Sequence, residues 1–463
     1  MTESRADIFS SVTASDVLKI VGAHVVFAFA LATVPQLSTL HALAVIVIGC
    51  WIAATNESPE WSACASAYVA GSEVLWRMTH AAVFWEIGKY ACCAIWLLAL
   101  GRMRHRRYDA SAISYFALLL PSVFFTLAAL DLGQSRQEIS FNLSGPLALA
   151  VGTCFFGNVS GRTVRLDRVF LALIAPAAST ASVQAYHTLT ASSITFTGSS
   201  NFVTSGGFGP NQVSAILGLA AFVTCFWLLA GKPTMPLKLT LFALVLLFGV
   251  QSALTFSRGG LYGAGGALLC SVACLLKDPR RRMAFLTIAP ALALLTSFVI
   301  LPALDDFTEG ALSARFRKTG VTHRDEIAMA DIRIWEEHPL FGIGPGMAKY
   351  ARGLALGEAA AHTEVSRLLS EHGMFGMTAL FFLLGIAKRN VAIASGEVSK
   401  ALVLGGTAWT FLFMLANGMR LAAPALAFGI CSARWYETRT AARWRVLTRA
   451  LSPAAIPAEM VSK

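Results

Sequence analysis

The sequence predicts an all-α membrane protein, a bundle of about 12 to 14 transmembrane helices with one long loop outside the cytoplasm that contains short helices. Of its 463 residues, 56% are hydrophobic and only 14% are charged, whereas a soluble domain carries about 25% charged residues. The apolar residues form long blocks, such as residues 239–250 and 285–301. Lipid offers no partner to an unpaired backbone group, so a run of about 20 apolar residues spans a bilayer as a helix.

A third observation, the distribution of basic residues, predicts the orientation of these helices. We expect spans at residues 18–35, 39–55, 83–101, 110–130, 142–158, 169–187, 211–230, 239–256, 260–276, 284–301, 373–387, 400–416 and 420–433. Basic tracts follow alternate spans at residues 102–107, 162–168, 232–238, 277–282, 388–389 and 434–449. These loops and the C-terminus are therefore predicted to be cytoplasmic. The same distribution explains the net charge of +11 without a nucleic-acid partner.

The N-terminal third needs one more crossing if the N-terminus is also cytoplasmic. Residues 63–80 could supply it, as a crossing or re-entrant helix. Glu73 and Arg77 are spaced there so that they can pair, and Glu86 and Lys89 are placed similarly in the next span. Two interpretations stay open, because such charges either hold helices together or form a polar site near the outer surface.

The longest connection, residues 302–367, divides the chain. We expect a transmembrane bundle at 1–301, an outer catalytic loop at 302–367, and C-terminal transmembrane helices with a cytoplasmic tail at 368–463. Long loops in compact proteins are usually functional or disordered, and this one is not of low complexity. It carries five arginines on the side where basic residues are disfavoured: Arg315, Arg317, Arg324, Arg333 and Arg352. They either hold an anionic group or form an ion-paired surface with the acids of the loop.

Four short motifs could carry chemistry. Residues 255–260, TFSRGG, place Arg258 as a fixed cation at the outer end of an apolar helix, where it binds an anion or simply snorkels to the surface. Residues 335–346 end in a turn rich in glycine and proline. Residues 361–373 place His362, Glu364 and Ser366 at the start of a helix, although other histidines compete for a role as base: His323, His338 and His372. Residues 198–212 form a polar loop that ends near Asn211.

Other chemistries have no support in the sequence. Most of the nine cysteines lie in apolar blocks and no CxxC pair occurs, so neither a zinc site nor a disulfide framework is predicted. The sequence contains no Walker loop, DxD, HExxH or GxSxG motif. We therefore predict no cofactor and no metal site.

Taken together, the motifs resemble the O-antigen ligase and O-antigen polymerase superfamily of bacterial membrane enzymes. The resemblance rests on Ser-Arg-Gly at residues 257–259, on HPLFGIGPG at 338–346, and on a histidine followed by EHGMFG at 371–376, and it covers about residues 207–384. Members often have asparagine after the active-site histidine and before the proline of the turn. Here Thr363 and His338 occupy those positions, which leaves open how the acceptor is handled.

The resemblance implies a metal-independent, inverting glycosyl transfer from an undecaprenyl-diphosphate carrier. His362 would be the general base on the acceptor hydroxyl, with Asn211, Glu364 and Ser366 as possible acceptor or loop contacts. Arginines would neutralise the donor diphosphate: Arg258, Arg315, Arg324 and Arg333. The implied partners are the carrier-linked oligosaccharide, an acceptor glycan or glycolipid, and the bilayer of the bacterial inner membrane, with the active site facing the periplasm.

Four hypotheses remain at this stage: a polymerase, a ligase, a transporter and a scaffold. A polymerase and a ligase differ only in their acceptor, so the sequence does not separate them. A transporter or flippase of lipid-linked oligosaccharide would need a polar cavity through the bundle, and two similar halves, whereas no internal repeat is present. A scaffold protein would not need the arginines and histidines to cluster.

Overall fold

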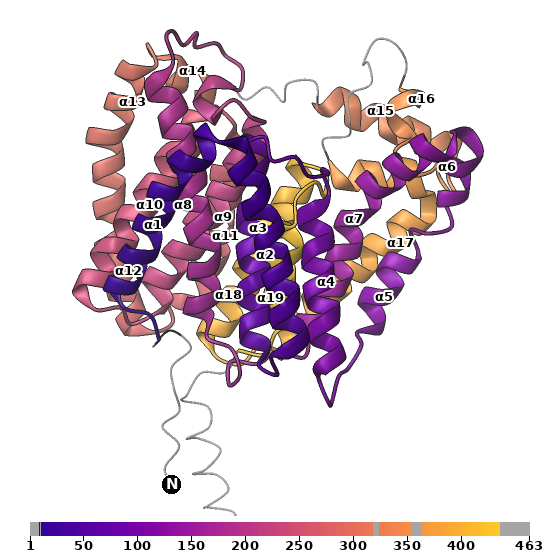
Figure 1. Ribbon diagram of the computed structural model, residues 1–463, viewed down its shortest axis with the longest axis horizontal. Coiled ribbons are helices and arrows are strands. Elements are labelled where there is room, and N and C mark those ends of the chain that lie inside the picture. The colour runs from indigo at the N-terminus through magenta and orange to yellow at the C-terminus, as the bar shows by residue number, and fades with distance from the viewer. Residues whose placement is uncertain (1–8, 10, 318–323, 353–362, 436–463) are drawn as a thin grey trace, which may run out of the picture.

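The chain is a multi-pass membrane protein built from helices. The computed structural model describes residues 9, 11–317, 324–352 and 363–435, and this part contains no β-strand (Figure 1). Nine helical stretches in it are long and apolar enough to cross a membrane. They are α1 (Ala14–Thr33), α2 (Pro35–Thr55), α7 (Leu132–Phe156), α8 (Leu166–Thr190), α9 (Pro210–Ala230), α10 (Met235–Leu254), α12 to α13 (Pro279–Phe307), α17 (Glu364–Ile393) and α18 (Glu397–Ala416). The predicted all-α membrane fold is confirmed.

The remaining helices explain why the predicted number of spans was higher. Four helices pack among these nine but are shorter or more polar: α3 (Pro59–Met78), α4 (Ile87–Arg102), α11 (Arg258–Leu275) and α19 (Ala423–Ser432). Helix α3 fills the interval that required an extra crossing, and its 20 residues measure about 30 Å, the thickness of a bilayer core.

The single span expected at residues 110–130 is instead two short helices. Helix α5 (Ala110–Ala117) and helix α6 (Val123–Ala129) are separated by a turn that contains Pro121. Proline has no N–H for the helical hydrogen bond and its ring crowds the preceding turn, which favours a break in the helix here. In Figure 1, α6 lies near the top of the molecule, beside α15 and α16.

Several of the predicted basic loops lie together at one end, called here the basic-loop end. The connection before α5 meets the one after α7, where Asn158 hydrogen-bonds the backbone N–H and C=O of Arg107 at 2.8 Å each. Arg389 at the end of α17 pairs with Asp109, and Arg168 pairs with Glu60 at 3.1 Å. Segments distant in sequence thus share one end, as alternating basic loops predict.

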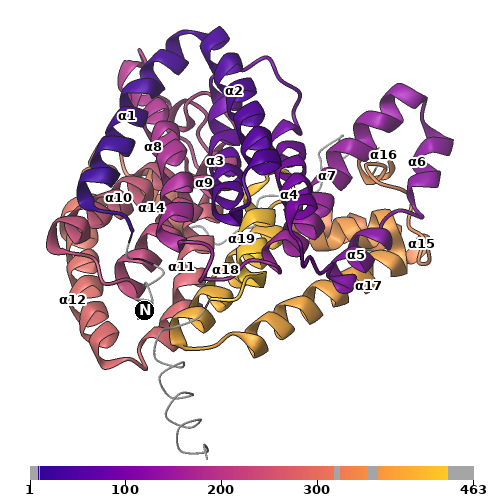
Figure 2. The same cartoon turned by 60° about the horizontal axis from the view of Figure 1, so that its bottom comes forward.

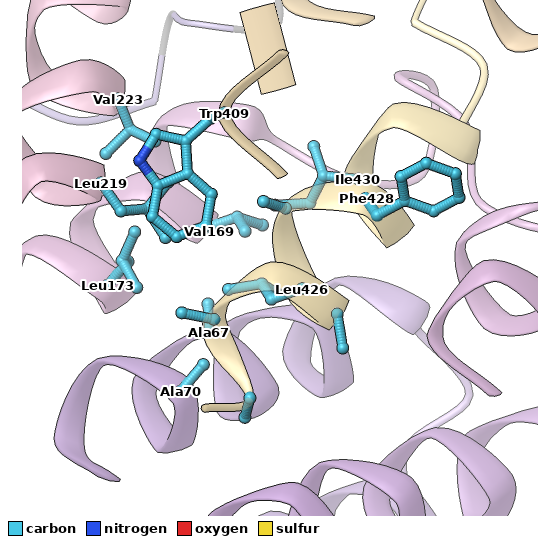
Figure 3. Packing of buried hydrophobic residues seen from close by; sticks show 14 of the residues in the cluster. Ala67, Ala70, Val169, Leu173, Leu219, Val223, Trp409, Leu426, Phe428 and Ile430 are labelled. Atoms are coloured by element: carbon cyan, nitrogen blue, oxygen red, sulfur yellow. The ribbon is translucent and has the colours of Figure 1, made fainter. Parts of the chain in front are cut away.

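Small and branched residues fill the middle of the bundle. Figure 3 shows side chains of α3, α8, α9, α18 and α19 packed together, including Ala67, Leu173, Leu219, Trp409 and Leu426. Alanine in α3 lets neighbouring helices approach closely, which is how membrane helices gain packing energy. Trp409 is 1% exposed. These side chains therefore form an apolar layer across the mid-bundle region.

Short helices lie at the opposite end. They are α14 (Ala311–Arg317), α15 (Arg324–Glu337) and α16 (Ala348–Ala351), with the 3-10 turn η1 (Val203–Ser205) in the α8–α9 connection. A π-helical segment, η2 (Thr296–Ile300), joins α12 to α13 (Leu301–Phe307). Helices α1 and α12 lie on one flank of the molecule and α5, α15 and α17 on the other (Figure 1 and Figure 2). The domain bounds at 301 and 367 stay a prediction.

Candidate functional site

The Ser-Arg-Gly motif forms a sharp junction between α10 and α11. Phe256 has a left-handed φ of 57°, and Arg258 is the first residue of α11. Ser214 of α9 holds the junction, because its hydroxyl donates to the Ser257 carbonyl at 2.9 Å and accepts from the Gly260 N–H at 3.1 Å. A Cβ on Gly260 would lie 1.9 Å from the Ser214 carbonyl oxygen. The glycine thus permits the close approach that fixes Arg258 at the helix end.

Two arginines from the long loop fold back onto this junction. Arg315 donates from Nε to the Phe256 carbonyl at 3.2 Å and from Nη1 to the Gly198 carbonyl at 2.8 Å. Arg324 donates from Nη1 to the Ala416 carbonyl at 3.2 Å and from Nη2 to Asn211 Oδ1 at 3.3 Å. Backbone carbonyls therefore orient both guanidinium groups without neutralising them.

The charges of Arg258, Arg315 and Arg324 act on one another, and we call the three the arginine cluster. Burial and the charge of Arg258 lower the pKa of Arg315. Burial and the charges of Arg258 and Arg315 lower the pKa of Arg324. Within the described residues, neither Arg315 nor Arg324 forms an ion pair with a carboxylate. An anion bound here would reduce the repulsion among the three guanidinium charges. Guanidinium groups also match the geometry of phosphate oxygens.

The other predicted site residues fall in different places. Arg333 is exposed on α15, nine positions beyond Arg324, which is about 13 Å along the helix. The structure does not bring it to the arginine cluster. Asn211 does lie there, since its Oδ1 also accepts from Ser257 Oγ at 2.7 Å. His362 and His323 lie outside the described residues.

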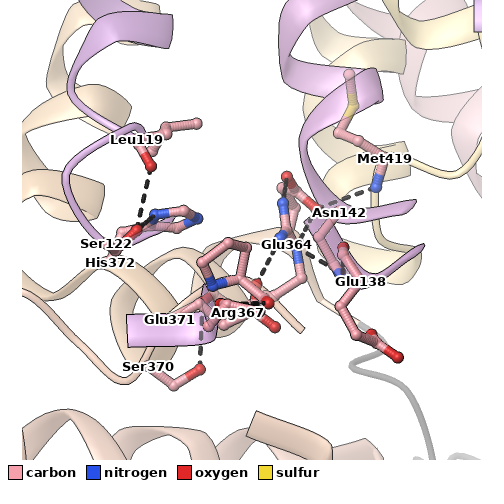
Figure 4. Close-up of polar contacts among 12 residues, drawn as sticks. Leu119, Ser122, Glu138, Asn142, Glu364, Arg367, Ser370, Glu371, His372 and Met419 are labelled. Carbon is pink, nitrogen blue, oxygen red and sulfur yellow. Dashed lines mark hydrogen bonds and ion pairs between the residues drawn. The ribbon is translucent and has the colours of Figure 1, made fainter. Parts of the chain in front are cut away.

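Glu364 and Ser366 are buried in ion-pair networks at the start of α17. Arg367 donates from Nε to Glu364 at 3.0 Å and pairs with Glu371 at 2.7 Å (Figure 4). Ser366 donates to Asp331 at 2.8 Å, and Asp331 also pairs with Arg352 at 2.7 Å. These two predicted contact residues therefore fasten α17 to its neighbours. Thr363, the residue after His362, caps the helix by accepting from the Ser366 N–H at 3.1 Å.

The glycine and proline turn packs against a break in α17. Gly373 has φ 58° and ψ −137° within the helix. The Met374 N–H therefore donates to the carbonyl of Pro339 at 2.8 Å instead of to the helix. In return, Ile343 and Gly344 donate to the carbonyls of Ser370 and Glu371, at 3.1 Å and 3.0 Å. The turn thus satisfies the backbone groups that the kink leaves open.

The other candidate bases differ in exposure. His372 is fully buried beside the kink and hydrogen-bonds Ser122 (Figure 4). His338 is exposed in the turn. Among the described residues, no hydrogen bond or ion pair joins either histidine to the arginine cluster.

A polar pocket of about 200 Å³, which the sequence did not predict, lies on the other side of Arg77. It is lined by Gln137, Glu138, Phe141, Asn142, Gly346, Lys349, Arg352, Arg367, Glu371, Gly418, Met419 and Arg420. The first four come from the start of α7, and of these Gln137 and Glu138 precede the span predicted at residues 142–158. The spacing of three and four residues among the four places them on one face of a helix, and this pattern could have predicted that the helix begins before them.

The predicted pair of Glu73 and Arg77 separates the pocket from the arginine cluster. Arg77 contacts Glu73 at 2.5 Å and donates to Gln212 Oε1 at 2.6 Å and to the Arg420 carbonyl at 3.3 Å. Glu73 also accepts from the Ala422 N–H at 2.6 Å. These contacts tie α3, α9 and the α18–α19 connection together, which supports the interpretation that the pair holds helices. Lys89 is also buried, and its Nζ lies 5.8 Å from the centre of the Phe141 ring.

The comparisons with known proteins identify one domain. A search of curated proteins finds no match to the chain. Residues 243–381 match a family model described as O-antigen ligase. This stretch runs from α10 into α17 and includes all three arginines of the cluster, the glycine and proline turn, and the kink at Gly373. The chain therefore carries an O-antigen ligase domain over residues 243–381.

Proposed function

We propose that the protein is a membrane glycosyltransferase. It transfers glycan from an undecaprenyl-diphosphate carrier to a sugar hydroxyl of an acceptor, on the periplasmic side of the bacterial inner membrane. The observation that carries this proposal is the arginine cluster, in which Arg315 and Arg324 are held at the α10–α11 junction by the Phe256 carbonyl and by Asn211, next to Arg258. The O-antigen ligase domain around the cluster supports glycan transfer as its use.

The arginines would stabilise the leaving group. As the acceptor oxygen attacks C1 of the donor sugar, the bond from C1 to the phosphate oxygen breaks and undecaprenyl diphosphate leaves with the electron pair. Guanidinium groups already oriented by carbonyls can neutralise this charge without reorganising, which is the role a metal plays in other transferases. Direct attack from the opposite face inverts the configuration at C1, so we propose an inverting, metal-independent transfer.

His362 would accept the proton of the attacking hydroxyl. A neutral imidazole can take a proton near pH 7, and a positioned base contributes about 10²–10⁴-fold to such a step. Thr363, the next residue, is the cap of α17. The position of His362 in the chain is thus next to a helix that two contacts tie to its neighbours, from Ser366 to Asp331 and from the Met419 N–H to Glu364.

The orientation follows from the basic loops. Alternating basic loops favour a cytoplasmic basic-loop end, which would place the arginine cluster at the periplasmic surface. A diphosphate there would leave its polyprenyl tail in the lipid beside the helices. The apolar packing of the mid-bundle region supports a transferase over a transporter, which would need a polar path between helices.

The test is an analysis of carrier-linked glycans in cells that lack the gene. We expect single repeat units to accumulate on the carrier if the protein is a polymerase, and long chains if it is a ligase. Expression of the wild-type protein should clear either intermediate, whereas Arg324→Ala at equal protein level should not. Accumulation of unmodified carrier-linked units only on the cytoplasmic leaflet would instead indicate a flippase and contradict the proposal.

A further inference from the structure

The polar pocket beside α7 differs in charge from the arginine cluster. Lys349 pairs with Glu138 at 2.6 Å, Arg367 with Glu371 at 2.7 Å and Arg352 with Asp331 at 2.7 Å, so these three cations of the pocket wall are compensated by carboxylates. Arg420 is the fourth cation that lines the pocket. Although burial opposes it, the contact with Glu138 raises the pKa of Lys349. A wall of fixed ion pairs offers both donors and acceptors, which suits hydroxyl groups better than a diphosphate.

The pocket also presents an aromatic ring and two amides. Phe141 is half-buried, and its neighbour Asn142 is held by a hydrogen bond from Nδ2 to the Glu138 carbonyl at 2.9 Å. Gln137 is exposed on the same face of α7. Sugar rings combine an apolar C–H face with a rim of hydroxyls, so an aromatic face beside amide and carboxylate groups matches their chemistry. About 200 Å³ is room for roughly seven water volumes, enough for one sugar residue.

The pocket and the arginine cluster border the same short connection. The Ala416 carbonyl accepts from Arg324, and residues 418–420 line the pocket. Four residues of chain span at most about 14 Å. Arg77 and Gln212 lie between the two sites, and Gln212 follows Asn211, which accepts a hydrogen bond from Arg324 of the cluster. A saccharide in the pocket would thus lie close to a diphosphate in the cluster but in a separate compartment.

We infer that this pocket, formed by Gln137, Glu138, Phe141, Asn142 and Lys349, binds the acceptor glycan at the sugar next to the terminal one, whose hydroxyl reacts beside the arginines. The inference rests on the proposed function, because it assigns the second saccharide of the same transfer. The donor sugar is attached directly to the diphosphate and stays beside the arginines. The sugar in the separate, charge-compensated pocket therefore belongs to the acceptor.

The test measures binding of each substrate separately, on the full chain in lipid nanodiscs by calorimetry. One probe is the phosphate-free oligosaccharide released by mild acid from the surface polysaccharide of the producing cells, and the other is undecaprenyl diphosphate. Phe141→Ala should weaken oligosaccharide binding about tenfold and Gln137→Ala about threefold. Neither should change binding of the carrier. Arg258→Ala should weaken binding of the carrier and leave oligosaccharide binding unchanged.

Gln134→Ala is the matched control, since Gln134 is exposed on α7 outside the pocket. Because Gln137 is exposed, its variant remains informative even if Phe141→Ala fails to fold. Wild-type-like oligosaccharide binding in both pocket variants, equal weakening of carrier binding, or no oligosaccharide binding by the wild type would each overturn the inference. If the wild type binds oligosaccharide, the pocket variants bind it less, and no glycan is transferred, the inference about the pocket is supported and the proposed function is contradicted.

Discussion

Asn211 shows how one neutral side chain sets the electrostatics of the arginine cluster. Its Oδ1 accepts from Ser257 Oγ at 2.7 Å and from Arg324 Nη2 at 3.3 Å. An amide oxygen orients a guanidinium group while leaving its charge available to a ligand, whereas a carboxylate in the same place would neutralise it.

The change Asn211→Asp tests this role with almost no change in shape. The new carboxylate should pair with Arg324 and compete with the donor diphosphate, so the KM for the donor should rise about tenfold or more. Steady-state transfer at varied donor concentration measures it, with thermal unfolding as the control for folding. An unchanged donor KM would mean that Arg324 does not meet the diphosphate.

His362 is tested against the two other histidines of this region. We expect His362→Ala to lower transfer by about 10²–10⁴-fold while carrier binding is kept, since a base acts on the chemical step. His338→Ala and His372→Ala should lower it less, because His338 is exposed in the turn and His372 is buried against Ser122. A dead His372→Ala beside an active His362→Ala would assign the base differently.

Local pattern predicted part of the site and missed the contacts made over long distances in the chain. The fixed cation at Arg258 and the buried pair of Glu73 and Arg77 follow from apolar blocks and helical spacing. The contact of Arg315 with Phe256 joins residues 59 positions apart, and no local period encodes it. The pocket was missed because α7 begins ten residues before the expected span, and its polar first turns looked like a loop.

Helix α17 and the glycine and proline turn act as one element. The turn supplies the hydrogen bonds that the kink removes, and its Gly346 also lines the pocket beside Glu138. A Cβ on Gly346 would lie 2.5 Å from Glu138 Oε2. The kink therefore brings the polar face of α17, with Arg367 and Glu371, against the start of α7.

Gly373→Ala tests the need for the kink. The residue has φ 58°, and a Cβ would lie 2.6 Å from the Pro339 carbonyl oxygen. We expect Tm to fall by about 3 °C or more and activity to fall with it. Gly385→Ala in the same helix is the matched control, because nothing lies within 4 Å of its Cβ position. It should leave Tm unchanged or raise it slightly. Equal Tm values for the two variants would contradict this account.

At the scale of the whole molecule, the two ends of the helix bundle carry different sets of charged residues. Ion pairs link the basic loops at one end, while the arginine cluster and the polar pocket lie at the other. The positive-inside rule favours the basic-loop end as the cytoplasmic one. The proposed chemistry therefore depends on the opposite end facing the periplasm.

Cysteine labelling tests this orientation. Asp306 on α13 and His105 in a basic loop are both exposed. In a background with the exposed Cys270 replaced by serine, Asp306→Cys should react with a membrane-impermeant maleimide while the inner membrane is intact. His105→Cys should react only after that membrane is opened. The reverse pattern would place the arginine cluster in the cytoplasm and exclude a periplasmic transfer.

The most direct test of the central claim is glycan transfer by purified protein from an undecaprenyl-diphosphate-linked donor, with and without chelator. We predict that the wild type transfers equally well in EDTA. Arg258→Ala should lose about 100-fold or more, and Arg258→Lys should also fall strongly because it keeps the charge but loses the planar fork. The exposed Arg333→Ala should lose less. Full activity in Arg258→Ala at normal protein level, or a wild type stopped by EDTA, would contradict the account.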